Sequence, residues 1–196
     1  MASRGNSKAK NEILDMLRED HQRVKKAFKA AEKLHAQDAH EELQALVEQT
    51  CAELQVHSRV EEEVFYPAAR EALKDEDLIE EAEVEHMSAK ALIEQLQGMT
   101  PEDPKYMATF TVLGEYTKHH IKEEESEMFE QLSSGRSKIQ WEELQQQMLT
   151  LRESLMAEMG LAEEGEEEDE EPQAGARSRG GRGKSEQPAD QEETVE

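Results

Sequence analysis

A short phrase that occurs twice in the chain, His-x-x-x-Glu-Glu, constrains the fold more than any other feature of the sequence. The first copy begins at His57 and includes Glu61, and the second begins at His120 and includes Glu124. Residues four apart lie on one face of an α-helix, one turn from each other. Each copy can therefore present an imidazole and a carboxylate to the same metal ion from one side.

The two copies belong to a longer repeat. His21 precedes His57 by 36 residues, and His86 precedes His120 by 34 residues. An acidic residue stands immediately before each of the two leading histidines. Matched spacings of this kind indicate an internal duplication, in which each half of the repeat is one helical hairpin.

Apolar residues recur at alternating threes and fours in five stretches of the chain, which is the pattern of an amphipathic helix. The five predicted helices cover about 11–35, 38–72, 77–97, 105–132 and 139–159. Each of the first four carries one of the four histidines in its apolar stripe, and Pro67 is expected to kink or end the second. The sequence therefore predicts an all-α fold, an up-down-up-down four-helix bundle with an additional C-terminal helix.

Composition divides the chain into four parts. We expect a flexible N-terminus over 1–10, the bundle over 11–135, the additional helix over 136–160 and a tail over 161–196. The additional helix is expected to cover the bundle or to mediate a homodimer or contact with a protein partner. The tail is acidic with a small Arg-Gly patch and has no periodic apolar residues, so it cannot offset the entropy lost on ordering and is predicted to be disordered.

The charge of the chain excludes some classes of partner. The sequence contains 47 acidic and 23 basic residues, a net charge of −24, which repels nucleic acids and anionic membranes. No apolar run approaches the roughly 20 residues of a membrane span. The single cysteine, Cys51, rules out an intramolecular disulfide and is interpreted as a small core residue. The cytoplasm is the default expectation for such a chain.

Six side chains are predicted metal ligands on the inward faces of the helices: His21, His57, Glu61, His86, His120 and Glu124. A single inward histidine is more often a hydrogen-bonded core residue than a ligand. Four of them, one in each helix, are a costly choice for a plain core, because every buried ring needs partners for its polar nitrogens. Coordination of a metal gives all four histidines the same reason.

Helical spacing leaves a second register open in the fourth helix. His119 and Glu123 are also four residues apart and could replace His120 and Glu124. The apolar stripe of that helix and its alignment with the first copy of the phrase favour His120 with Glu124. His119 is then expected to lie at the flank of the site.

Six ligands suit two metal ions better than one. Two octahedral ions offer about twelve positions, of which four nitrogens and two bridging carboxylates fill about eight. A shared oxo or hydroxo bridge would fill about two more and leave about one open position on each ion. Imidazole and carboxylate without thiolate favour iron ahead of manganese or zinc.

This ordered set of ligands resembles the hemerythrin-like, or HHE cation-binding, family over about residues 11–135. The resemblance implies a non-heme di-iron centre in which the four histidines are terminal ligands and Glu61 and Glu124 are bridging carboxylates. The sequence departs from the oxygen-carrying hemerythrins at Lys90, where they have a further histidine, and at Glu125, where they have an aspartate. The set is more similar to di-iron proteins that repair iron–sulfur centres and to domains that sense iron or oxygen.

Three functions remain open on the sequence alone. The first is a di-iron protein that binds O2, peroxide or NO in sensing or in the response to oxidative or nitrosative stress. The second is a di-iron enzyme that consumes peroxide or repairs iron–sulfur centres, for which Tyr116 is the candidate proton donor. The third is a helical interaction protein without a functional metal. The sequence does not decide whether the protein is an enzyme.

Overall fold

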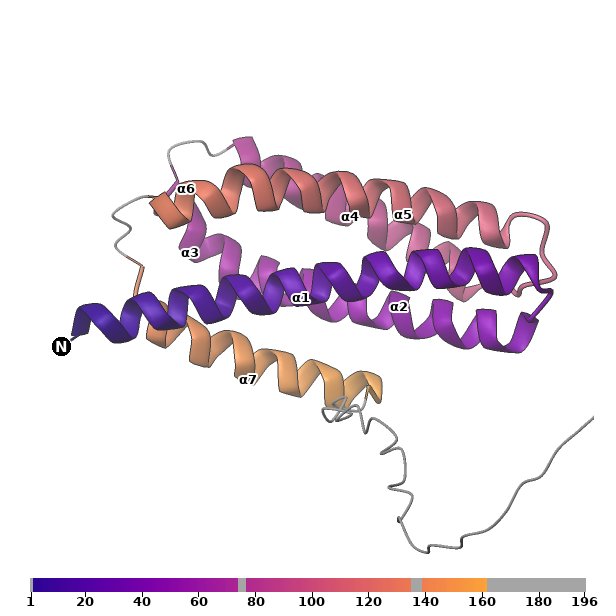
Figure 1. Cartoon of the computed structure of the whole chain (residues 1–196), viewed down its shortest axis with the longest axis horizontal. Coiled ribbons are helices and arrows are strands. Elements are labelled where there is room, and N and C mark those ends of the chain that lie inside the picture. The colour runs from indigo at the N-terminus through magenta and orange to yellow at the C-terminus, as the bar shows by residue number, and fades with distance from the viewer. Residues whose placement is uncertain (1, 74–76, 135–138, 162–196) are drawn as a thin grey trace, which may run out of the picture. The chain divides into compact units, whose positions relative to one another are not determined.

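The structure is a computed structural model that describes residues 2–73, 77–134 and 139–161, and the described residues lie in helices and the turns that join them (Figure 1). Our prediction of disorder for the tail falls on 162–196, outside the described residues. None of the described helices is apolar enough over a sufficient length to cross a membrane.

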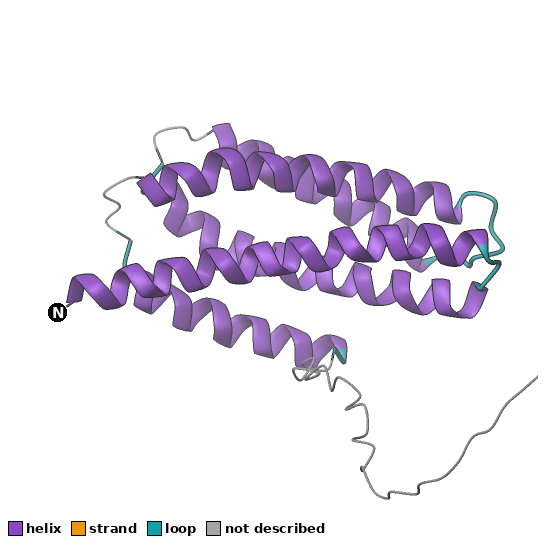
Figure 2. Ribbon diagram, in the orientation of Figure 1, coloured by secondary structure: helices purple, strands orange, loops and turns teal. Residues whose placement is uncertain are grey.

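Two helical hairpins form the bundle, as the duplication predicted. The first hairpin consists of α1 (Ala2–Ala36), α2 (His40–Val60), the π-helical segment η1 (Glu61–Phe65) and α3 (Tyr66–Arg70). The second consists of α4 (Asp77–Gln97), α5 (Tyr106–Glu123), the π-helical segment η2 (Glu124–Met128) and α6 (Phe129–Ser134). The turn between α1 and α2 and the turn between α4 and α5 lie at the same end of the bundle (Figure 2). The predicted all-α bundle with a further C-terminal helix is confirmed.

The fifth long helix, α7 (Trp141–Met159), packs on one flank of the bundle, against α1, α2 and η1. Trp141, Leu144, Met148 and Leu155 are its buried residues. The helix ends where Gly160 adopts a left-handed conformation (φ 68°), which glycine adopts at little cost. The structure shows that this helix covers the bundle, and its role in a homodimer or in contact with a protein partner stays a prediction.

The first helix begins earlier than we predicted. We expected residues 1–10 to be a flexible N-terminus, but α1 already starts at Ala2. The side chain of Asn6 donates to the backbone oxygen of Ile139 (3.1 Å) and accepts from the backbone nitrogen of Trp141 (2.6 Å), and Ala9 is buried. The sequence did not indicate this early start, because the hydrogen-bond partner of the segment lies more than 130 residues away in the chain.

Two apolar clusters fill the bundle, one toward each end. The cluster near α3 and α6 includes Phe65, Tyr66 and Phe129, and the cluster near the opposite turns includes Phe28 and Phe110. Three of the predicted ligand histidines, His21, His86 and His120, fall in the sequence gaps between the residues of these two clusters, and His57 lies directly after Val56, where the first cluster begins in α2. A buried polar layer therefore crosses the middle of the bundle.

Candidate metal centre

The structure brings the six predicted ligands together in this polar layer. The histidines come from α1, α2, α4 and α5, and the two glutamates are the first residues of η1 and η2. The exposed fractions are His21 1%, His57 6%, Glu61 0%, His86 5%, His120 6% and Glu124 2%. Six titratable side chains so deeply buried in one place require compensation from each other or from a ligand.

Both glutamates begin a π-helical segment, which the sequence analysis did not predict. A π segment contains an extra residue per turn, is rare, and frequently lies at functional sites. It explains why two bulky residues follow each glutamate at four and five positions, since Phe65 and Tyr66 are both fully buried in the first hairpin. Pro67 follows η1, but the second copy has Glu130 at the matching position, so proline is not the cause. The signal in the sequence was the adjacent pair of bulky apolar residues, which does not fit a regular 3.6-residue turn.

The ε-nitrogens of the histidines converge on the two carboxylates. His57 Nε2 lies 3.2 Å from Glu61 Oε1, and His86 Nε2 lies 3.4 Å from Glu61 Oε2. Glu124 Oε2 lies 3.2 Å from His21 Nε2 and 4.0 Å from the Nε2 of the fourth histidine. Potential ligand atoms form two groups, each within 4.8 Å, and Glu61 belongs to both. The first group is His21, His57, Glu61 and Glu124, and the second is Glu61, His86 and His120.

Five buried atoms at this centre have no hydrogen-bond partner among the described residues. They are His21 Nε2, His57 Nε2, Glu61 Oε1 and both carboxylate oxygens of Glu124. A buried polar atom without a partner costs on the order of 1–3 kcal/mol. Bound cations would give all five atoms a partner. Because the ligand atoms form two groups, the residues present fit a pair of metal ions.

The pKa values of the two central carboxylates, Glu61 and Glu124, are both shifted, as is common at sites that bind cations. Burial raises the pKa of Glu61 well above its ordinary value, and the nearby charge of Glu124 raises it further. Burial opposes ionisation of Glu124 too, but the close approach of His21 Nε2 and of the other histidines outweighs it and lowers the pKa of Glu124. Two carboxylates so close together in a dry core oppose each other's ionisation, and a shared cation would remove this conflict.

The second nitrogen of each histidine is held by an outer carboxylate. The Nδ1 contacts are His21 with Glu125 at 2.8 Å, His57 with Asp20 at 3.3 Å, His86 with Glu62 at 3.0 Å and His120 with Glu85 at 3.0 Å. When a carboxylate accepts a hydrogen bond from the Nδ1–H group, the lone pair of Nε2 remains available and is directed at the centre. Such pairs orient histidines that bind metals.

These outer contacts follow the duplication. The acid that precedes each leading histidine holds the trailing histidine of the same hairpin. The acid that follows each central glutamate holds the leading histidine of the other hairpin, as Glu62 holds His86. Two lysines at matching positions pair with this second kind of acid: Lys90 Nζ lies 2.6 Å from Glu62, and Lys25 Nζ lies 3.4 Å from Glu125. The sequence showed these acids as part of the repeat, but not their role.

Asp20 is the outer carboxylate that the fifth helix reaches. Arg152 of α7 donates to both of its oxygens, with one contact at 2.8 Å, and Arg23 also pairs with it. Burial alone would raise the pKa of Asp20, but its contacts with His57 and Arg152 hold it well below the usual range. The fifth helix is thereby connected to a predicted ligand through a single side chain.

Two further expectations can be compared with the structure. His120 lies in the buried layer, whereas the side chain of His119 is 60% exposed, so the geometry agrees with the register we favoured. Tyr116, our candidate proton donor, is 50% exposed, and the buried phenol that lies beside the centre is Tyr66, whose oxygen is 3.4 Å from Glu61 Oε2. Tyr66 was missed because its apolar position in the repeat suggested packing alone.

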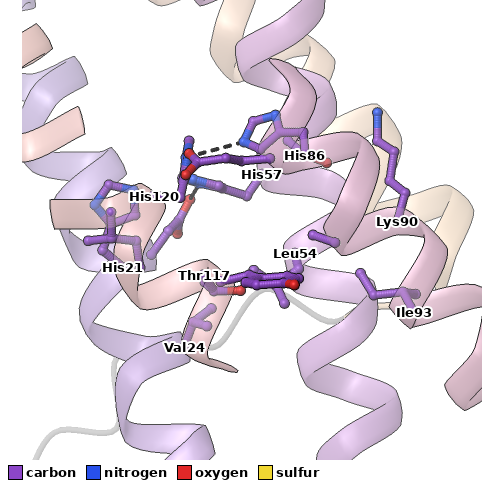
Figure 3. Close-up of a pocket in the computed structure, with 15 residues that line it drawn as sticks. His21, Val24, Leu54, His57, His86, Lys90, Ile93, Thr117 and His120 are labelled. Carbon is purple, nitrogen blue, oxygen red and sulfur yellow. Dashed lines mark hydrogen bonds and ion pairs between the residues drawn. The ribbon is translucent and has the colours of Figure 1, made fainter. Parts of the chain in front are cut away.

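A cavity of about 30 Å³ adjoins the centre. Figure 3 shows the four histidines on one side of it and Val24, Leu54, Ile93 and Thr117 on the other, with Lys90 at the edge. A water molecule needs roughly 10–15 Å³ of such space. The cavity therefore suits a ligand of two or three atoms and is too small for an organic substrate.

The fold and site define a helical-bundle protein with two clusters of histidine and glutamate that are compatible with a dimetal site. The chain belongs to the hemerythrin HHE cation binding domain family, whose model matches residues 12–132. A crystal structure of a hemerythrin HHE cation binding domain-containing protein from Mycobacterium kansasii has the same fold, with a TM-score of 0.60 and 24% identity. The alignment covers 74% of this chain and 86% of that one.

A curated relative is a DNA nickase from Nostoc sp., which is 25% identical over 158 residues. The similar region is 81% of this chain but 44% of the relative, so the chain spans less than half the length of that protein.

Proposed function

We propose that the protein holds two iron ions at this centre and binds O2, peroxide or NO there, in sensing or in the response to oxidative or nitrosative stress. The observation that carries the proposal is the set of five buried, unpaired ligand atoms beside a cavity of about 30 Å³. When bound, the iron pair would supply redox chemistry and open positions for a small ligand.

The residues of the chain have separate tasks in this proposal. The four histidines together with Glu61 and Glu124 would hold the two ions. The outer carboxylates keep each Nε2 directed inward, and the apolar wall that includes Val24, Leu54 and Ile93 keeps bulk water and larger molecules away. Manganese or zinc would fit less well, because nitrogen and oxygen donors without thiolate favour iron.

A second candidate function, a di-iron enzyme that consumes peroxide, draws on the position of Tyr66. Its O–H lies against Glu61 and is buried, so it can hold or deliver a proton at the centre. Burial and the two carboxylates raise the pKa of Tyr66 well above its ordinary value, so the phenol keeps its proton at neutral pH.

The activity named for the Nostoc relative is not part of this proposal. The net charge of −24 opposes the approach of DNA, and the match leaves more than half of that relative without a counterpart. A helical interaction protein without metal is also a poor fit, because such a protein gains nothing from five unpaired buried atoms.

Metal analysis and visible spectroscopy test the proposal. The protein loaded with iron without oxygen should contain two ions per chain and, after oxidation, give absorption bands that shift with azide or peroxide. His57→Ala and Glu61→Ala should lose these bands, and His120→Ala should lose iron while His119→Ala keeps it. A wild-type protein that binds no transition metal after loading would overturn the proposal. Turnover of peroxide by the loaded protein, reduced in Tyr66→Phe, would instead favour the enzyme.

A further inference from the structure

A third group of possible ligands lies on the surface of the second hairpin, outside the centre. His119 Nε2 lies 3.3 Å from Glu123 Oε1 and 3.6 Å from Glu85 Oε1. The side chains of these three residues are 60%, 34% and 23% exposed, respectively, and their ligand atoms lie within 4.8 Å of one another. We call His119, Glu85 and Glu123 the surface triad.

The surface triad is connected to the buried centre in two ways. Glu85 belongs to both, since its Oε1 faces His119 while its Oε2 holds Nδ1 of His120. A crevice of about 10 Å³ is lined by Glu85 and Glu123 together with the buried Glu124. Both oxygens of Glu124 lack a hydrogen-bond partner among the described residues. A buried carboxylate without a hydrogen-bond partner therefore lines the same crevice as two of the three triad residues.

The first hairpin has no such triad at the matching positions. Val56 and Val60 stand where the second hairpin has His119 and Glu123, and they are 3% and 1% exposed in the apolar cluster that α7 completes. The counterpart of Glu85 is Asp20, which Arg152 of α7 neutralises. One flank of the duplicated centre is therefore sealed by apolar residues and an arginine, and the other flank exposes cation ligands.

We infer that the surface triad captures a divalent first-row metal ion, chiefly Fe²⁺, before the ion enters the buried centre at Glu124. The inference rests on the proposed function, because it requires a buried centre that takes up metal. One imidazole and two carboxylates suit Fe²⁺ or Mn²⁺. Glu123 would hold the ion first, and its chain neighbour Glu124, which lines the same crevice, would hold it at the buried centre. Local negative charge at such an entrance raises the rate of cation capture by about 10- to 1,000-fold.

The rate of metal uptake tests the capture site. Metal-free protein is mixed with Co²⁺, whose visible bands report binding to nitrogen and oxygen ligands, and with Fe²⁺ in a parallel series without oxygen. The test variant is H119A/E123Q, which spares Glu85 and every buried ligand. The control is H40A/E102Q, which removes another exposed histidine–glutamate pair (3.3 Å) with the same change of charge.

We expect H119A/E123Q to fill the buried centre at least about tenfold more slowly than the wild type, and to reach the same two ions per chain. The control should load at the wild-type rate. Equal rates in the test variant and the control would overturn the capture site while the proposed centre stands. A wild-type protein that never fills its buried centre would overturn both.

A direct count of ions gives a second measurement. The loaded wild-type protein, titrated with Mn²⁺ and followed by electron paramagnetic resonance, should bind one further ion weakly, and H119A/E123Q should not. An unchanged count of weakly bound Mn²⁺ in the variant contradicts the inference. Circular dichroism of both double variants checks that the fold is kept, which the exposure of the substituted side chains leads us to expect.

Discussion

At the scale of single residues, the environment of His57 shows how burial favours a neutral imidazole. Burial lowers the pKa of His57 to about 4, although the hydrogen bond with Asp20 opposes the shift. The ring is therefore a neutral donor of electrons at pH 7, the form that binds a metal. As a consequence, the pKa of His57 differs between the folded and unfolded chains, and stability depends on pH.

The metal-free protein should lose stability as the pH falls from about 6.5 toward 4, because the unfolded His57 takes up a proton that the folded residue refuses. Between pH 7 and pH 5 this residue should contribute a loss of about 2 kcal/mol. Urea unfolding at the two pH values measures it, and His57→Gln should show a fall that is smaller by this amount. Equal falls in the two proteins would contradict the assignment.

At the scale of elements, the close approach of α1 and α5 depends on a glycine. A Cβ at Gly114 would lie 2.9 Å from the ring of Phe28, which is itself packed on Phe110 at a centroid distance of 4.8 Å. The two helices each carry a ligand histidine about two turns from this contact, His21 on α1 and His120 on α5. The spacing of the helices, and with it the spacing of the ligands, is set by the missing side chain.

Gly114→Ala should therefore lower the free energy of unfolding by about 1–3 kcal/mol, the usual cost of overpacking a core. A smaller ring neighbour should relieve the strain, so Phe28→Leu should cost less in the Gly114→Ala background than in the wild type. A double-mutant cycle with urea unfolding measures the coupling. Additive effects of the two substitutions would show that the contact is not strained.

The fifth helix should be fastened to the bundle through Arg152. Arg152→Met removes a partner of the buried Asp20, and we expect a loss of about 2 kcal/mol, below the 3–5 kcal/mol for a fully broken buried pair because Arg23 and His57 remain. Arg59→Met is the matched control. Arg59 of α2 also pairs with a residue of α7, Glu158, at 3.8 Å, but the side chain of Arg59 is 39% exposed. The control should change stability by less than about 1 kcal/mol. A similar loss in both variants would refute a special role for Asp20.

The structural role of α7 marks the limit of what the sequence could predict. The helices and the inward set of ligands followed from spacing, because the 3.6-residue period fixes which side chains share a face. The outer carboxylates and Arg152 did not follow, since their contacts depend on which helices are neighbours and how they are rotated. His57 and Asp20 are 37 residues apart, and Arg152 and Asp20 are 132 apart. The π segments were not predicted for another reason: they break the 3.6-residue period on which the prediction of the helices relied.

At the scale of the whole molecule, the centre divides one core into two apolar clusters joined through polar groups. Without a cation the unpaired atoms at the centre weaken this connection, and with one they strengthen it. A ligand that binds only the folded state stabilises it by about 2.7 kcal/mol at 100 times its dissociation constant. Metal binding and the stability of the bundle should therefore be linked.

Removal of metal should lower the melting temperature of the wild-type protein by about 5–10 °C, given roughly 2–4 °C per kcal/mol for a chain of this size. Differential scanning calorimetry with and without a chelator measures the shift. His120→Ala, which lacks a ligand, should melt at the same temperature in both conditions. A chelator effect as large in the variant as in the wild type would place the stabilising ion elsewhere.

The exchange of outer carboxylates between the hairpins has a consequence for how this protein can change. Because Glu62 holds His86 and Glu125 holds His21, two copies of one hairpin around a twofold axis would contain every inner and outer group of the centre. In such a symmetric homodimer any substitution appears twice, and both flanks must remain alike. In the single chain each half mutates alone, so that one flank could acquire Val56, Val60 and a covering helix while the other acquired His119 and Glu123. A single chain therefore allows the centre to have one covered flank and one flank that is open to solvent.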